Sequence, residues 1–284
     1  EITYGDWSSD VCSSDLHCLI APLDDELRRA GASTLLISLD DTLRYLPFAA
    51  LHDGTRYLCE RYRIVVYTAA ARRHLATPPE TSWRVAGLGV SEASGSGFRP
   101  LPGVRGELDS IVREEGSEDQ QGVFPGVVHL DNRFTSSQLR ADLNAGYPVV
   151  HIASHFKFQP GSKTDSFLLL GDGQRLNLDD FQIEEFRFSS VDLLTLSACE
   201  TAFGGRDARG REIESFGVLA QQLGAKAVLA TLWQVEDMST AELMANFYRY
   251  RQKGLSKIDA LQEAQLAFIR GQGGSVAEQD GAVQ

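Results

Sequence analysis

The sequence predicts an α/β protein whose mostly parallel sheet is covered by helices on both faces. Several strand candidates are apolar throughout, at 148–154, 191–198 and 227–235. Segments in which apolar residues recur at helical spacing alternate with them, for example at 212–223. A strand that is apolar on both sides must be buried on both sides, which is typical of a parallel sheet between two helical layers.

The first half of the chain predicts short strands with tight turns. We expect strands within 33–54, where Asp-Asp and Asp-Gly pairs interrupt the apolar runs, and again at 62–68 and 84–91. The stretch 92–102 is rich in Gly, Ser and Pro, which predicts a loop, and 105–115 has helical character.

The second half is more regular. After the first apolar strand we expect, in order, a strand hairpin at 166–178, a short acidic helix at 179–186, a strand at 191–198, a helix at 212–223, a strand at 227–235, and helices at 240–252 and 256–270. Asp172-Gly173 is the turn signal of the hairpin, and Gly224 is a stop signal for the helix before it. Ser239, with Glu242 three residues later, predicts a capping box at the next helix.

The chain divides into four predicted segments. Residues 1–16 are excluded from the fold, because 6-DWSSDVCSSDL-16 has no structural period and looks like a reading frame of a sequencing-library adapter; the alternative is a disordered terminus. Residues 17–145 form an N-terminal α/β part, 146–270 a C-terminal catalytic part, and 271–284 a Gly-rich, polar tail that we expect to be disordered. We therefore expect the chain to be a fragment of a longer protein.

Composition excludes several classes of function. The net charge of −12 disfavours a surface that binds nucleic acid or an anionic membrane. The sequence contains no run of 18 apolar residues, so we expect no membrane span. The four cysteines form no CxxC pair and have no zinc-like spacing with the six histidines. Without a secretory signal, we expect reduced thiols and a cytoplasmic protein.

Three chemically capable residues follow strand candidates. His155 comes after 148–154, Cys199 after 191–198, and Asp237 after 227–235. Because ligands of such sheets bind outside the carboxyl ends of the strands, the three side chains should meet at one edge.

Each of these residues also has a structural interpretation. A lone cysteine is commonly a small buried hydrophobe, and a strand histidine is commonly a satisfied core residue. His151 and His155 lie four apart on an extended segment and therefore share a face, so their spacing does not rank them, although His151 should be the more buried. A two-histidine metal site lacks a third ligand, and 87-GLG-89 lacks the rest of a dinucleotide fingerprint, so we expect no metal and no cofactor.

With these residues in hand, the chain resembles the CHAT domain family, the caspase- and separase-like proteins of bacteria that are often fused to tetratricopeptide repeats. The resemblance covers roughly residues 25–270. The segments that carry it are 46-LPFAALHDG-54, 101-LPGVRGEL-108, 151-HIASHFKF-158, 167-FLLLGDG-173, 193-LLTLSACETAFGG-205, 223-LGAKAVLATLWQVED-237 and 243-LMANFYRYRQKG-254.

The resemblance implies a caspase-like three-layer α/β/α sandwich and a cysteine endopeptidase acting on protein substrates. It makes His155 the general base and Cys199 the nucleophile, and it implies a tetratricopeptide-repeat module on the same full-length chain that regulates the enzyme. Two features depart from the family pattern: Phe156 stands where many relatives have glycine, and the usual closing segment is missing after Arg270. The alternative function is a catalytically silent interaction scaffold.

The resemblance also assigns a substrate-binding role to Asp237. A carboxylate in the pocket for the residue before the cut would select Arg or Lys. Glu236 is the competing candidate, because consecutive residues point in opposite directions, and a helix cap is the structural alternative for Asp237.

Overall fold

The computed structural model describes residues 16–39, 43, 46–92, 97–114, 116, 121–157, 165–200, 215–231 and 237–271. At residues 198–200, 215, 237 and 238 it describes the backbone only.

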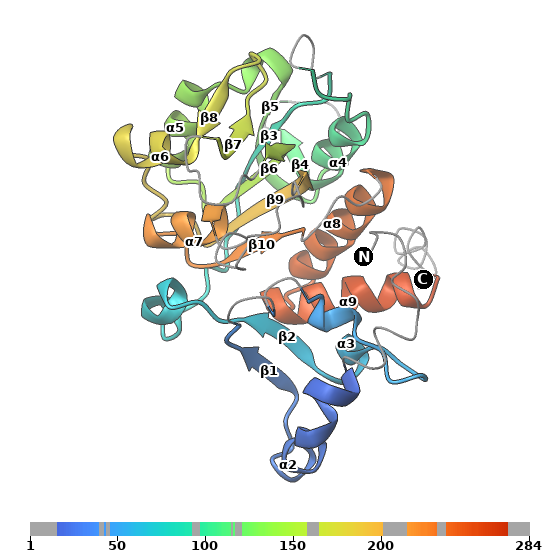
Figure 1. The fold of residues 1–284 in the computed structure, drawn as a ribbon. Coiled ribbons are helices and arrows are strands. Elements are labelled where there is room, and N and C mark those ends of the chain that lie inside the picture. Colours follow the sequence, from blue (N-terminus) through green and yellow to red (C-terminus); the bar gives the residue numbers. More distant parts are fainter. Residues whose placement is uncertain are drawn as a thin grey trace.

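An eight-stranded sheet forms the centre of the molecule (Figure 1). Its strands are β3 (Val85–Gly89), β4 (Val112–Glu114), β5 (Phe124–Leu130), β6 (Val149–Lys157), β7 (Phe167–Leu169), β8 (Arg175–Asn177), β9 (Leu193–Glu200) and β10 (Val228–Ala230). Six of them lie in the order β10-β9-β6-β3-β5-β4, and every neighbouring pair in that series is parallel. The hairpin β7-β8 continues the sheet in the antiparallel sense from the end of β6. The predicted mostly parallel sheet is confirmed.

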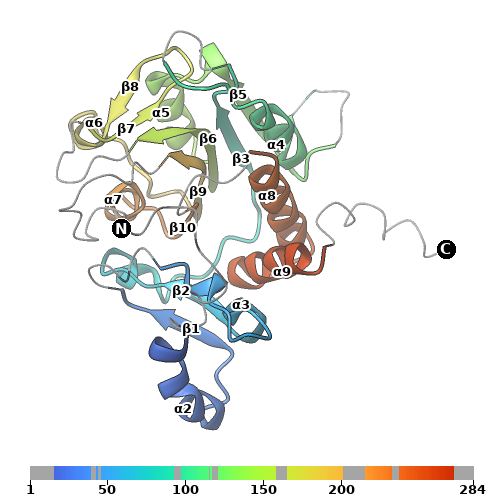
Figure 2. The ribbon, with the colours of Figure 1, turned by 45° about the vertical axis from the view of Figure 1, so that its right-hand side comes forward.

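Helices cover both faces of this sheet, which makes the three-layer α/β/α sandwich (Figures 1 and 2). One layer contains α5 (Ser136–Asn144), α6 (Leu178–Ile183) and α7 (Ser215–Gln222), whose buried side chains form a core cluster with one face of the strands. The other contains α4 (Gly103–Ile111), α8 (Asp237–Gln252) and α9 (Lys257–Ile269), which form a second core cluster with the opposite face. Val150 and Val149, consecutive in β6, lie in different clusters, as the alternation of a strand requires.

A smaller unit precedes the main sheet and packs against α9. It contains the parallel pair β1 (Thr34–Ile37) and β2 (Arg63–Val66) with α2 (Asp24–Arg29), α3 (Leu58–Arg61) and the 3-10 turns η1 (Ala21–Leu23) and η3 (Phe48–Ala50). Leu16, the last residue of the segment predicted to lie outside the fold, is buried in the core of this unit. The 3-10 turns η4 (Ala70–His74) and η5 (Asp131–Arg133) lie in later loops.

Two glycine signals in the second half are confirmed. The hairpin turns at Asp172-Gly173, where Gly173 has a φ of +81°, and α7 stops before Gly224, at a φ of +125°. The boundary predicted between residues 145 and 146 stays a prediction; the main sheet takes strands from both sides of it.

Several predicted boundaries are wrong. β6 extends to Lys157 and β9 to Glu200, so His155 and Cys199 belong to the last residues of their strands rather than following them. Helix α8 begins at Asp237, which places Ser239 inside the helix instead of at its cap. The helix expected to reach residue 115 ends at Ile111, because the chain there joins the sheet edge as β4.

Candidate functional site

The two candidate catalytic residues lie on neighbouring strands at the same edge of the sheet. β6 and β9 pair in parallel from Val149 onward, and near their carboxyl ends Phe156 of β6 is opposite Cys199 of β9. His155 is therefore one residue from the Cα partner of Cys199. The backbones alone place the two residues side by side, as the position of their strands predicted.

A β-bulge separates the regular part of β6 from this end. The register moves three residues on β6, from Ala153 to Phe156, while it moves two on β9, from Ser197 to Cys199. A bulge of this kind bends the strand and redirects the side chains that follow. His151 and His155 thus lie on opposite sides of an irregularity, although their spacing suggested equivalent positions.

His155 is oriented by the loop that follows β3. Its Nε2 atom lies 2.8 Å from the carbonyl oxygen of Arg99, and its ring lies 4.8 Å from that of Phe98. A carbonyl oxygen only accepts hydrogen bonds, so Nε2 carries the proton and Nδ1 of the neutral ring is left to act as a base. The orienting groups Arg99 and Phe98 were not found from the sequence, because a backbone carbonyl leaves no residue signature.

His151 has a different environment, deep between the sheet and its α4-α8 layer. Its Nε2 atom is 2.9 Å from Glu107 Oε1, and its Nδ1 atom is 3.1 Å from the hydroxyl of Tyr248. The side chain is fully buried, whereas His155 is 5% exposed, which confirms the predicted difference in burial. Both ring nitrogens of His151 are engaged, so this residue is a structural partner.

The hydrogen bonds of His151 belong to a buried polar network of five side chains. Ser197 donates to Glu107 Oε2 at 3.1 Å, and Thr195 lies 2.9 Å from the Tyr248 hydroxyl. All five are at most 2% exposed. The network joins β6 and β9, the strands of the candidate dyad, to α4 and α8. Burial raises the pKa of Tyr248, so its hydroxyl stays protonated and available as a donor.

The cysteines differ in setting. Cys59 is buried in α3, where burial raises the pKa of its thiol to about 11, and Cys18 is exposed. Of Cys199 the structure describes the backbone, and Cys12 lies outside the described residues. A thiol with so high a pKa is almost entirely protonated at neutral pH, which makes Cys59 a poor nucleophile.

Asp237 is the first residue of α8. A carboxylate at this end of a helix interacts favourably with the helix dipole, whatever else it does. Its side chain and the whole of Glu236 lie outside what the structure describes, so the substrate-binding role of Asp237 stays a prediction.

Phe156, the departure from the family pattern, points into the core. Its side chain is 7% exposed and packs against Phe216 of α7, with the ring centroids 5.4 Å apart. The ring is therefore packed among core side chains of the α5-α7 layer.

Residues 16–279 match the family model of the CHAT domain. The chain belongs to the CHAT domain family. No curated protein matches the chain. The match includes Leu16 and covers nearly the whole sequence, and the caspase-like α/β/α sandwich of the family agrees with the sheet order and layers above.

In the part of the chain that the structure describes, no helix combines the length and the apolar character that crossing a bilayer requires. The same residues contain no group of three or more His, Cys, Asp or Glu side chains arranged to hold a metal ion.

Proposed function

We propose that this CHAT domain is a cysteine endopeptidase that cleaves protein substrates with a His155–Cys199 dyad. The observation that supports it best is the pairing of β6 with β9, which puts the two residues on adjacent strand ends within one residue of alignment. Nucleophile and base must be neighbours in space, and the base must be oriented by a third group. The Arg99 carbonyl is that third group for His155.

The tautomer of His155 sets the proton transfers. With the proton of Nε2 held by Arg99, Nδ1 takes the proton of the Cys199 thiol, and the thiolate attacks the carbonyl carbon of the scissile peptide bond. Backbone N–H groups, including that of Cys199, stabilise the oxyanion of the tetrahedral intermediate. The protonated Nδ1 then donates to the leaving amine, and the bond between carbon and nitrogen breaks.

The second half of the reaction repeats these roles with water. His155 Nδ1 takes a proton from a water molecule, whose oxygen attacks the thioester carbon of the acyl-enzyme. The sulfur leaves, is reprotonated, and the carboxylic acid product is released. No group other than the dyad, the backbone and water is needed for the balance of atoms.

Specificity and control complete the proposal. Asp237 would select Arg or Lys before the cut by a charge-assisted, and for Arg potentially bidentate, contact. A tetratricopeptide-repeat module of the full-length protein would regulate access to the site, an arrangement suggested by the family alone. The protein would act in the cytoplasm.

A substrate-like electrophile tests the dyad directly. We expect a peptidyl chloromethyl ketone ending in Arg or Lys to alkylate Cys199, with loss of chloride, and peptide mapping by mass spectrometry locates the adduct. His155→Ala should slow this alkylation, because the thiolate loses its base, while leaving that of exposed Cys18 unchanged. Alkylation of Cys199 no faster than that of Cys18 favours the silent interaction scaffold instead.

A further inference from the structure

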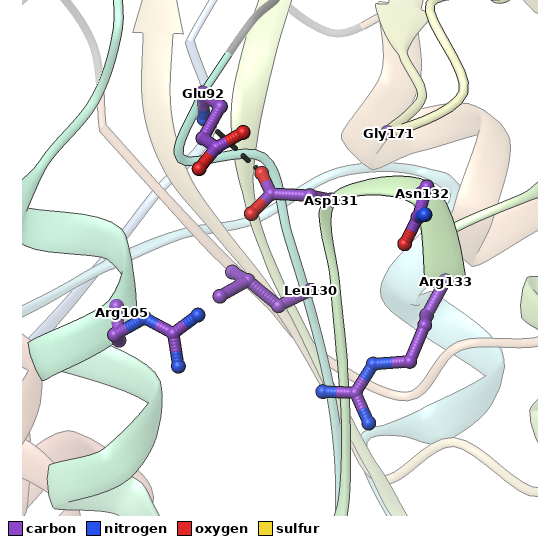
Figure 3. A pocket seen from close by; sticks show the side chains of 7 residues that line it. All are labelled: Glu92, Arg105, Leu130, Asp131, Asn132, Arg133 and Gly171. Atoms are coloured by element: carbon purple, nitrogen blue, oxygen red, sulfur yellow. Dashed lines mark hydrogen bonds between the residues drawn. The ribbon is translucent and has the colours of Figure 1, made fainter.

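A polar pocket opens beside the candidate site, at the carboxyl ends of β3 and β5 (Figure 3). It has a volume of about 380 Å³. Its lining residues come from the loop after β3, from α4, from the end of β5 and the following η5, and from the β7-β8 turn: Glu92, Arg105, Leu130, Asp131, Asn132, Arg133 and Gly171. None of these residues has a role in the proposed dyad.

Two arginines point toward one another from opposite sides of this pocket, Arg105 from α4 and Arg133 from η5 (Figure 3). Neither forms an ion pair or a side-chain hydrogen bond with any residue that the structure describes. Arg105 also lies in the first turn of α4, which has no acidic residue and no side-chain cap. A cation at this end of a helix is unfavourable, so helix stability does not explain its presence there.

The pocket is held rigidly. Asp131 has a φ of +50°, a left-handed conformation that its carboxylate supports by accepting hydrogen bonds from the Ser91 N–H at 2.7 Å, the Ser91 hydroxyl at 2.8 Å and the Glu92 N–H at 3.1 Å. Gly171 comes so close that an added Cβ would lie 1.7 Å from the Asp131 carbonyl oxygen. Three loops are thereby fixed together, and the carboxylate of Asp131 is occupied by the loop after β3.

We propose that this pocket binds an acidic side chain of the polypeptide substrate, between Arg105 and Arg133. Guanidinium groups recognise carboxylates in a planar, bidentate geometry. Phosphate fits arginine equally well, but Glu92 lines the same pocket and would repel a group with more than one negative charge. The pocket therefore contains both basic and acidic side chains, which favours a ligand with a single negative charge. A carboxylate on a polypeptide has that charge, and the N–H groups of the polypeptide can donate to the acceptor atoms of the lining.

The sheet gives the distance from the cut. Neighbouring strands are about 4.8 Å apart, so β5 lies roughly 10 Å from β6 and about 14 Å from β9. An extended peptide advances about 3.3 Å per residue, so the acidic residue should stand about three to five residues from the scissile bond. This inference rests on the proposed function for the identity of the bound chain.

Binding to the Cys199→Ala protein tests the pocket without depending on cleavage. Each fluorescently labelled peptide has one fixed basic residue and carries either Asp or Asn at one of the five positions on each side of it. Its binding to the protein is measured by fluorescence anisotropy. We expect one Asp peptide to bind about 10-fold more tightly than its Asn counterpart, and the preference to vanish in Arg105→Gln and Arg133→Gln. Arg72→Gln, an exposed arginine on η4 away from the pocket, is the control and should keep it.

The results separate the two proposals. An Asp preference that needs both arginines, in a protein whose wild type cleaves nothing, supports the pocket and contradicts the peptidase. Equal binding of Asp and Asn peptides, binding of none, or a preference that survives both substitutions overturns the pocket proposal. Tighter binding of a phosphoserine peptide than of its Asp counterpart overturns the choice of a carboxylate.

Discussion

Removing the hydroxyl of Tyr248 tests whether the buried polar network stabilises the fold. Tyr248→Phe keeps a ring that packs against Phe247 at 5.2 Å and Trp83 at 6.1 Å, and removes only the oxygen between His151 and Thr195. Two fully buried polar atoms then lose a partner. At about 1–3 kcal/mol for each, the free energy of unfolding should fall by roughly 2–6 kcal/mol, a large part of a typical domain's stability.

Urea unfolding followed by far-ultraviolet circular dichroism measures this loss. Tyr250→Phe is the matched control, because it removes a hydroxyl from the same helix that has no hydrogen bond among the described residues, and it should change stability by less than about 0.5 kcal/mol. Adding Thr195→Val to Tyr248→Phe should cost less than the sum of the single changes, by about 1 kcal/mol, since the orphaned hydroxyl is then gone. A Tyr248→Phe protein as stable as the control refutes the network's role in holding the two strands.

Two further predictions concern the cysteines and the specificity pocket. With a pKa of about 11, Cys59 is only about 0.1% thiolate at pH 8, so iodoacetamide should label Cys18 before Cys59. The labelling rate of Cys59 should rise about tenfold per pH unit up to that pKa. Equal labelling rates of Cys18 and Cys59 at pH 8 in the folded protein would contradict the burial of Cys59. Asp237→Asn should abolish a preference for Arg or Lys before the cut in a peptide library. An unchanged preference, with a loss of only about 0.3–1 kcal/mol in the free energy of unfolding, would mean that Asp237 only stabilises the end of the helix.

The fold was predictable where one physical pattern dominated. Strands buried on both faces must be apolar throughout, so β6 and β9 could be recognised, and the edge rule of parallel sheets then aligned His155 with Cys199. Strand β5 was not predicted, because 124-FPGVVHL-130 contains a proline and a glycine that normally argue against a strand. Gly126 is required there, since an added Cβ would lie 1.9 Å from the carbonyl oxygen of Val85 in β3.

The sequence predicted the sheet edge at which the candidate site lies, but not the bulge and the hydrogen bonds that hold the site in place. The bulge in β6 depends on the register with β9, which one strand's sequence does not contain. Glu107 did leave a signal: it lies on the apolar face of α4 with Val104, Leu108 and Ile111, where a carboxylate needs a buried partner. Its partners could not be named, because they come from strands and a helix far along the chain.

Peptide hydrolysis by the purified protein and four alanine variants tests the central claim. We expect the wild-type protein to cleave, Cys199→Ala to be inactive, His155→Ala to lose about 10²–10⁴-fold in rate with its circular dichroism unchanged, and Cys59→Ala to keep most of its activity. His151→Ala should lose activity only together with stability, because its contacts are structural. Cleavage that is equal in wild type and Cys199→Ala, or a larger loss in a folded His151→Ala protein than in His155→Ala, would contradict the assignment of the dyad.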